Sequence, residues 1–249
     1  MASNPNYCDV TPEIEALAAL ALENSCIDPE DYVRYDVKRG LRDLNGKGVL
    51  AGLTEVSDIV AKKIVDGQEL PCDGKLYYRG IDVEQLVGQA LKEGRFGFEE
   101  TAYLLLLGRL PKAAELEDFR RQLSYYRSLP NNFVRDVILK APSQDIMNSL
   151  ARSVLNLASY DDRCDDISLP NVMRQCLQLI ALFPVLSVYG YQAYSHYHDG
   201  NSLFIHVTLI PYHRGKHPFP APGRLLLLLL GGPRAGYLHD PPRRAWRRQ

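Results

Sequence analysis

The first 195 residues of this 249-residue chain contain no histidine, and all six histidines lie at position 196 or later. Histidine is the side chain that enzymes use most often for acid–base chemistry, and it is a common metal ligand. A glycine-rich phosphate loop, a G-x-S-x-G nucleophile turn and an H-E-x-x-H metal motif are also absent from the sequence. The sequence therefore offers no motif for nucleotide hydrolysis, serine-based hydrolysis or zinc proteolysis.

Cysteine is scarce and shows no pairing pattern. There is no C-x-x-C pair, and the five cysteines are Cys8, Cys26, Cys72, Cys164 and Cys176. An odd set without close pairs indicates reduced thiols rather than a disulfide framework or a zinc site. Residues 1–11 are polar and lack the apolar core of a signal peptide, and no apolar run approaches the ~20 residues that cross a bilayer. We therefore expect a cytoplasmic protein without a membrane partner.

Acidic residues almost disappear after position 206. Residues 207–249 contain eight Lys and Arg residues and one acid, Asp240, whereas residues 1–206 contain 21 basic and 29 acidic residues. The same segment holds seven of the sixteen prolines and the single tryptophan, Trp246. The prolines and the unpaired positive charge predict that residues 207–249 are disordered.

Apolar residues at helical spacing dominate the rest of the chain. Thr11-Pro12 and Asp28-Pro29 each combine an N-cap residue with proline at the first helical position. They predict one helix through Leu22 and a second that ends near Gly40. Ser143 is expected to cap a later helix, and Pro184 is expected to kink the last one. The later predicted helices cover residues 82–93, 98–107, 112–128, 131–140, 143–160 and 168–195.

A small β element precedes these later helices. Val49–Ile59 is rich in β-branched residues, and Lys75–Arg79 contains Leu76, Tyr77 and Tyr78. The two segments are expected to form a small sheet. The predicted fold class is therefore mainly α, a helical domain with a small β element near residues 49–79.

Two stretches of the sequence are the most informative. The first runs from Gly74 to Leu86 and reads G-K-L-Y-Y-R-G-I-D-V-E-Q-L, where Gly80 permits a turn and Asp82 is suited to cap a helix. The second runs from Phe98 to Pro111 and reads F-E-E-T-A-Y-L-L-L-L-G-R-L-P. Its helix has no polar stripe from Ala102 onward, which predicts burial on most sides, and it should end at Gly108.

Several polar residues are candidates for a site, and each has a simpler structural interpretation. The carboxylates Asp161, Asp162, Asp165 and Asp166 lack the ligand spacing and the turn glycine of a calcium loop, so a solvated loop between helices is expected. Glu99 and Glu100 open a helix, where their charge suits the helix dipole. Arg79 is expected to have a buried partner and no contact with substrate.

The histidines and the two unusual runs near the end of the chain are interpreted in the same way. His196 and His198 are two residues apart on a helix and should point to different sides, and His206 follows a strand-like run. All three are expected to be structural or surface residues rather than metal ligands. Leu225–Leu230 is too short for a membrane span. The basic end, Arg243–Arg248, could contact nucleic acid, but it lacks a surrounding fold.

The two informative stretches, in this order and at this spacing, resemble the citrate synthase family in its bacterial form. The resemblance covers roughly residues 35–206. It implies a mainly helical large domain and an acyltransferase of the tricarboxylic acid cycle that condenses acetyl-CoA with oxaloacetate to give citrate and CoA. It also implies a homodimer, no metal, no covalently bound cofactor, and no nucleic acid or membrane partner.

The catalytic residues of the family are not found in this chain. In the family, an Asp removes a proton from the acetyl methyl group, one His stabilises the resulting enol, and a second His acts on the oxaloacetate carbonyl. The histidines belong to H-x-G-G-N and G-P-x-H-G-G-A-N motifs, and neither motif occurs here. We therefore predict no catalytic, cofactor-binding or metal-binding residue, and a truncated chain that is inactive as an enzyme.

The resemblance divides the chain into three parts. Residues 1–40 are a helical extension, residues 41–206 are part of the large domain, and residues 207–249 do not follow the family pattern. Read one nucleotide downstream, the codons for Gly231 to Gln249 permit E-A-R-V-L-D-I-F-M-I-L-H-A-E-H-G-G-G-N, which ends in the missing histidine motif. Trp246 has one codon, and the Arg after it then forces Gly in the shifted frame. We hypothesise that residues from about 207 are an out-of-frame translation.

Two alternatives remain open at this point. One keeps the family and changes the acyl donor to propionyl-CoA, which gives 2-methylcitrate. The other is a non-catalytic helical interaction module whose basic tail binds an acidic partner.

Overall fold

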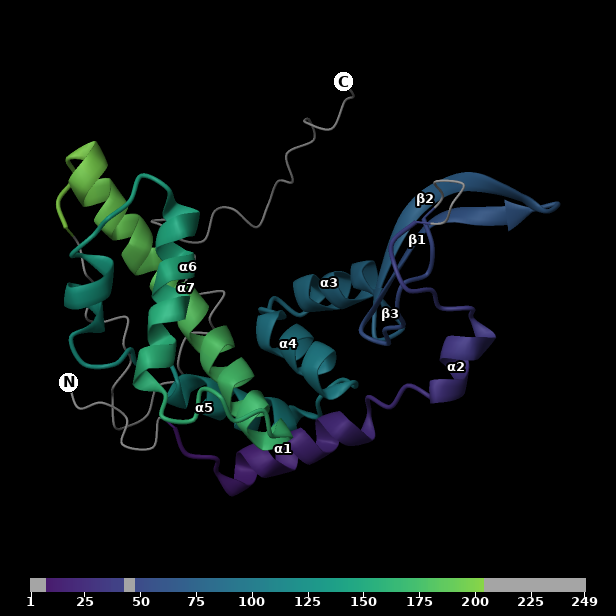
Figure 1. Ribbon diagram of the computed structural model, residues 1–249, viewed down its shortest axis with the longest axis horizontal. Coiled ribbons are helices and arrows are strands. Elements are labelled where there is room, and N and C mark those ends of the chain that lie inside the picture. Colours follow the sequence, from purple (N-terminus) through teal and green to yellow (C-terminus); the bar gives the residue numbers. More distant parts are fainter. Residues whose placement is uncertain (1–7, 43–47, 204–249) are drawn as a thin grey trace.

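The computed structural model describes residues 8–42 and 48–203. In these ranges the chain is mainly helical and has one small antiparallel sheet (Figure 1), so the predicted fold class is confirmed. Two short turns, η1 (Val134–Ile138) and η2 (Ala158–Tyr160), are π-helical and 3-10 helical. The α-helices are α1 (Pro12–Glu23), α2 (Pro29–Arg34), α3 (Val83–Lys92), α4 (Phe98–Leu107), α5 (Ala113–Tyr125), α6 (Ile146–Leu157) and α7 (Leu169–Asp199).

Helix α7 is the centre of the helical body. Helices α1, α5 and α6 and the turn η1 all pack against it. Its N-terminal half joins α1, α4 and α5 in one buried cluster, which includes Tyr103 and Leu177. Its C-terminal half joins η1 and α6 in a second cluster, which includes Phe133 and Leu186. One long helix therefore connects two separate cores.

The length and apolar composition of α7 also match those of a membrane span, the one such helix in the described residues. The expectation that no apolar run approaches this length is therefore wrong for α7. More than half of its most apolar window is buried inside the protein, and the fully buried Arg174 lies within it. These features are those of a core helix. The helix also continues past Pro184.

The sheet forms an arm that extends away from the helices (Figure 1). Strands β1 (Ser57–Val65), β2 (Gln68–Tyr78) and β3 (Ile81–Asp82) pair in that order, all antiparallel. The strand predicted at residues 75–79 is confirmed as the end of β2. The strand predicted at Val49–Ile59 is confirmed only at Ser57–Ile59, which pair with Leu76–Tyr78 as expected; its predicted start at Val49 is wrong, because the first paired residue is Ser57.

Two tight turns determine this register. Asp66 and Gly67 join β1 to β2 with φ of 51° and 77°, and Arg79 and Gly80 join β2 to β3 with φ of 48° and 78°. Two successive positive φ values suit the right-handed twist of a hairpin. The first turn pairs Val65 with Gln68. The pairing that continues from there places Tyr78, the last residue of β2, opposite Ser57. No strand partner is therefore left for residues 49–56.

Local signals placed several helix ends correctly. Asp28 Oδ1 accepts a hydrogen bond from Glu30 N at 2.9 Å, and Asp82 Oδ1 accepts one from Glu84 N at 2.8 Å. Gly108 ends α4 with φ of 81°. No residue of α4 after Phe98 is exposed, which confirms the predicted burial of this helix.

Other boundaries differ from the prediction. Helix α2 ends at Arg34, well before Gly40, and Asp36 then adopts a φ of 50°. The helix predicted at 131–140 is reduced to the π-helical turn η1. Helix α6 begins at Ile146, because Asp145 is its cap and accepts from Asn148 N at 3.0 Å, so the prediction that Ser143 is the cap is wrong.

The segment predicted to be disordered, residues 207–249, lies outside the described residues, as do His206, Leu225–Leu230 and the basic end Arg243–Arg248.

Candidate functional site

The acidic cluster between α6 and α7 is only partly the solvated loop that was predicted. Asp162 and Asp165 are exposed. Asp161 is instead ion-paired to Arg174, with Oδ2 2.7 Å from Nη2, and Asp166 pairs with Arg163 at 2.5 Å. Two of the four carboxylates therefore have structural partners.

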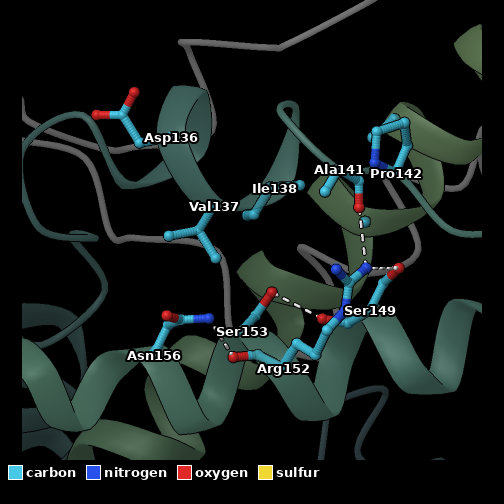
Figure 2. Close-up of a pocket in the computed structure, with 11 residues that line it drawn as sticks. Asp136, Val137, Ile138, Ala141, Pro142, Ser149, Arg152, Ser153 and Asn156 are labelled. Carbon is cyan, nitrogen blue, oxygen red and sulfur yellow. Dashed lines mark hydrogen bonds between the residues drawn. The ribbon is translucent and has the colours of Figure 1, made fainter.

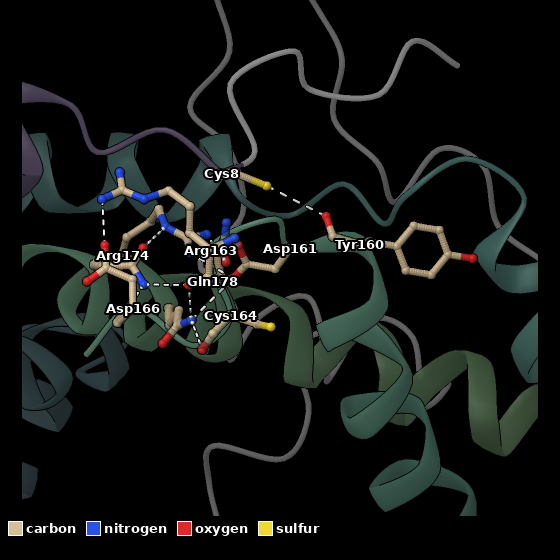
Figure 3. A network of polar contacts seen from close by, with 10 residues as sticks. Cys8, Tyr160, Asp161, Arg163, Cys164, Asp166, Arg174 and Gln178 are labelled. Atoms are coloured by element: carbon tan, nitrogen blue, oxygen red, sulfur yellow. Dashed lines mark hydrogen bonds and ion pairs between the residues drawn. The ribbon is translucent and has the colours of Figure 1, made fainter. Parts of the chain in front are cut away.

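Arg174 is the centre of a buried polar network (Figure 3). Its side chain is 0% exposed. Besides its ion pair with Asp161, Nε donates to Asn171 Oδ1 at 2.9 Å and Nη1 donates to Gln178 Oε1 at 3.0 Å. Asn171 in turn donates to the Asp166 backbone oxygen at 2.7 Å. The network fixes the loop between α6 and α7 onto the start of α7.

The protonation of Asp161 reflects this network. Burial by itself raises the pKa of this carboxyl group, but the hydrogen bond from Arg174 and others, including the Arg163 amide, outweigh burial and lower the pKa below its usual value. The Asp161 carboxyl group is therefore ionised at physiological pH. Because each carboxylate and guanidinium of this pair is already bonded within the protein, the arrangement is structural.

Arg79 has a buried side chain, but the prediction that its partner is buried is wrong. Ser25 and Glu55 are exposed, and Leu105 is half-buried. The Arg79 side chain is 7% exposed, and Nη2 donates to Ser25 Oγ at 2.9 Å and to the Leu105 backbone oxygen at 3.1 Å. Nη1 lies 3.8 Å from Glu55 Oε2. The side chain thereby ties the turn before β3 to the segment after α1 and to the end of α4.

Glu99 is a feature that sequence reasoning missed. It is 0% exposed, and neither carboxylate oxygen has a hydrogen-bond partner among the described residues. Burial raises the pKa of Glu99, and the positive charges of Arg120 and Arg127 oppose this rise. Its neighbour Glu100 is half-buried and, unlike Glu99, has a charged partner, Arg95.

The two histidines in the described range have structural surroundings. His196 Nδ1 lies 2.7 Å from the Asn201 backbone oxygen. The His198 ring lies beside Tyr194, with 5.3 Å between ring centroids. They contact different residues, as their spacing predicted. No group of three or more His, Cys, Asp or Glu side chains within the described ranges is placed to hold a metal ion.

A cavity lies between η1, α6 and α7 (Figure 2). Its volume is about 190 Å³. Four polar side chains of α6 form one side, and Gly190 and Ala193 of α7 form another. The full lining is Asp136, Val137, Ile138, Ala141, Pro142, Ser149, Arg152, Ser153, Asn156, Gly190 and Ala193.

Arg152 is the strongest polar feature of this cavity. Its Nη2 donates to the Ala141 backbone oxygen at 2.9 Å and lies 3.4 Å from Ser149 Oγ. Its Nε is buried and has no hydrogen-bond partner in the described part of the chain. Ser153 donates to the Ser149 backbone oxygen at 2.8 Å, and Asn156 donates to that of Arg152 at 2.9 Å. A guanidinium flanked by hydroxyl and amide groups suits an anion.

Sequence reasoning did not single out this group, although a signal was present. Ser149, Arg152, Ser153 and Asn156 follow the helical i, i+3, i+4, i+7 spacing, so they form a polar stripe along α6. The spacing does not reveal that η1 and α7 lie against this stripe in the folded chain.

Comparison with known proteins connects this fold to one family. The family model described as "Citrate synthase, C-terminal domain" matches residues 41–227. The matched range therefore extends into the segment from 207 onward that was predicted to be out of frame. A citrate synthase of Haloferax volcanii is 33% identical over 132 residues, which cover 52% of this chain and 29% of the relative.

A second relative and a solved structure agree. The citrate/2-methylcitrate synthase of Bacillus subtilis is 32% identical over 145 residues, or 58% of this chain and 35% of the relative. The crystal structure of citrate synthase from Pyrobaculum aerophilum has a TM-score of 0.50 at 24% identity, covers 80% of this chain and 51% of the solved chain, and supports the fold. The chain spans about a third of the curated relatives named here. With three quarters of its length matched by the family model, this chain belongs to the citrate synthase family.

Proposed function

We propose that this chain contributes the helical scaffold of an acyltransferase that condenses an acyl-CoA with oxaloacetate. The observation that carries the proposal is the family match over residues 41–227, on a helical body built around α7. The enzymes named among its relatives are citrate synthases and 2-methylcitrate synthases. Acetyl-CoA and propionyl-CoA are therefore both candidate donors, with no metal and no covalently bound cofactor.

The 249 residues themselves are proposed to be inactive in this reaction. Removing a proton from an acyl methyl group needs a placed base and a donor directed at the enolate oxygen. The two histidine motifs that supply such groups in the family are absent from the sequence. Of the described histidines, His196 and His198 lie at the end of α7 with structural contacts. The alternative of a non-catalytic interaction module has no support in the comparisons.

The proposed partner is a second copy of the chain, in the cytoplasm. Along α7, Val172, Leu179 and Phe183 are exposed at helical spacing, and Met147 and Leu155 are exposed on the neighbouring α6. Exposed apolar residues at helical spacing are typical of an interface. In a two-fold symmetric dimer, the same residues of a second chain would cover these side chains, and both copies would be buried together.

The test measures release of free CoA from acetyl-CoA and from propionyl-CoA, with and without oxaloacetate. The 249-residue chain is compared with a variant whose gene is read one nucleotide downstream from about codon 207. We expect oxaloacetate-dependent release by the variant alone, and the preferred donor distinguishes the two reactions. Turnover by the 249-residue chain would show that its own residues catalyse the step, and inactivity of the variant would overturn the reading-frame hypothesis.

A further inference from the structure

We propose that the cavity between η1, α6 and α7 binds a small oxyanion, a carboxylate or phosphate group, with Arg152 as its charged ligand (Figure 2). This proposal does not rest on the condensation reaction. It is argued from the charge, the hydrogen-bonding groups and the size of the cavity.

Within the described part of the chain, no carboxylate is ion-paired with Arg152. The hydrogen bonds of its guanidinium go to a backbone oxygen, that of Ala141, and to the hydroxyl of Ser149. Its Nε is buried and has no acceptor within the described ranges. A buried donor without an acceptor is unfavourable, and hydrogen bonds between ionised partners are the strong ones. An oxyanion in the cavity would supply the missing acceptor and the missing negative charge.

The other charged group of the lining, Asp136, does not cancel this charge. Both of its carboxylate oxygens accept hydrogen bonds from Arg135, from Nε and Nη2 at 2.8 Å each. The hydrogen bond from Arg135 lowers the pKa of Asp136, so this carboxylate is ionised and already paired. Arg135, Asp136 and Arg152 together therefore leave one net positive charge beside the cavity.

The size of the cavity restricts the ligand. About 190 Å³ is far above the space that one water requires, but it is below the ~300 Å³ at which pockets for drug-sized ligands begin. A phosphate ion or a short carboxylate fits, whereas a nucleotide does not. On the α7 side, a Cβ added at Gly190 would meet no atom within 4 Å, so the absence of a side chain there contributes to the open space.

The backbone around the site is also unusual. The wall opposite α6 includes Val137 and Ile138 of the π-helical turn η1. Short π-helical segments are rare and occur frequently at functional sites. In Figure 2, Ser153 and Asn156 point from α6 toward this turn. The polar stripe of α6 therefore lines the cavity, with Ser153 buried and Asn156 at its solvent-exposed end.

The test is isothermal titration of the full 249-residue chain with potassium phosphate and, separately, with sodium succinate. Potassium chloride at matched ionic strength is the control for screening of surface charge. We expect saturable binding of at least one of the two oxyanions, with a Kd of about 10 mM or tighter. Binding of phosphate alone or of succinate alone identifies which group the site prefers.

Four variants locate the binding. Arg152→Gln should weaken it by about 10- to 100-fold, because one charge-assisted hydrogen bond is removed. Gly190→Leu should prevent it by filling the cavity, whereas Gly190→Ala, with a side chain that meets nothing, should bind better than Gly190→Leu. Arg121→Gln, at an exposed residue of α5 that does not line the cavity, should bind as the original chain does.

Circular dichroism of each variant shows whether it is folded. If Arg152→Gln is unfolded, Gly190→Leu still tests the site, because it fills the cavity and leaves Arg152 unchanged. The proposal is overturned if neither oxyanion binds saturably to the folded chain. It is also overturned if Arg152→Gln and Gly190→Leu are folded and bind with unchanged affinity.

Discussion

The guanidinium of Arg174 and the carboxylate of Asp161 lie 2.7 Å apart across the junction between α7 and the preceding loop, and their side chains are only 0% and 8% exposed. Removing one partner of such a buried ion pair strongly destabilises the fold, because the remaining charge is left buried without a partner. The pair is therefore the most deeply buried of the contacts that hold this loop on α7, beside the hydrogen bonds from Asn171 to the backbone oxygens of Arg163 and Asp166.

We predict that Asp161→Ala lowers the free energy of unfolding by about 3–5 kcal/mol. The matched control is Asp166→Ala, which removes a more exposed pair with Arg163 in the same loop and should cost clearly less than Asp161→Ala, because exposed ion pairs contribute little to stability. Urea unfolding followed by circular dichroism measures both. Equal, small effects of the two substitutions would show that the Arg174 pair is not the stronger constraint.

Two buried carboxyl groups should give opposite pH dependence of stability. The pKa of Asp161 is lowered in the folded chain. The contribution of this carboxylate to the free energy of unfolding is therefore complete above the unfolded pKa of 3.8, and it is lost as the pH falls through the folded pKa. The pKa of Glu99 is raised by burial. The contribution of this group to the free energy of unfolding is therefore complete below the unfolded pKa of 4.5, and it is lost as the pH rises through the folded pKa.

Glu99→Gln tests this sign. The change in the free energy of unfolding caused by the substitution should be more favourable at pH 7 than at pH 4. At pH 7 the neutral amide avoids the ionisation of a buried group. Glu117→Gln is the control, since Glu117 is exposed on α5. Thermal unfolding between pH 4 and pH 8 gives the comparison, and a Glu99→Gln effect that does not change with pH would refute the burial argument.

Gly108 should tolerate no side chain. It ends α4 with φ of 81°, and a Cβ there would lie 2.6 Å from Asn24 Cβ and 2.9 Å from the Asn24 backbone oxygen. Gly108→Ala is expected to destabilise the chain by about 2–4 kcal/mol, from the positive φ and the overlap together. Gly200→Ala has a similar φ of 72° but meets no atom within 4 Å, so it should cost only about 1 kcal/mol. Unfolding midpoints in urea separate the two.

Local signals in the sequence predicted the parts of this fold that depend on neighbouring residues. Asp28, Asp82 and Gly108 act within one turn of the chain, and their roles are confirmed. The hairpin turn at Asp66-Gly67 is an equally local signal that was overlooked, and it displaced the predicted strand from Val49 to Ser57. The error was therefore one of interpretation rather than of missing information.

The candidate site required tertiary information. The spacing of Ser149, Arg152, Ser153 and Asn156 shows that they share a face of α6, but it does not show that η1 and α7 enclose that face. In the same way, nothing near Glu99 in the sequence reveals its burial, because the two arginines that influence its pKa come from α5 and the segment after it. Polar groups that face the interior were the residues hardest to interpret from sequence.

The last prediction concerns self-association. Val172, Leu179 and Phe183 are exposed apolar residues on one stripe of α7, and an uncovered stripe of this kind favours association. We expect the original chain to sediment as a dimer or a larger species, and Leu179→Glu combined with Phe183→Glu to shift it toward monomer, since burying two charges in an apolar interface is strongly unfavourable. Leu22→Glu is the control, because Leu22 is also exposed but belongs to α1. Sedimentation velocity at several concentrations measures the species present. A monomeric original chain, or a double variant that associates as strongly as the original, would show that this stripe is not the surface through which two copies meet.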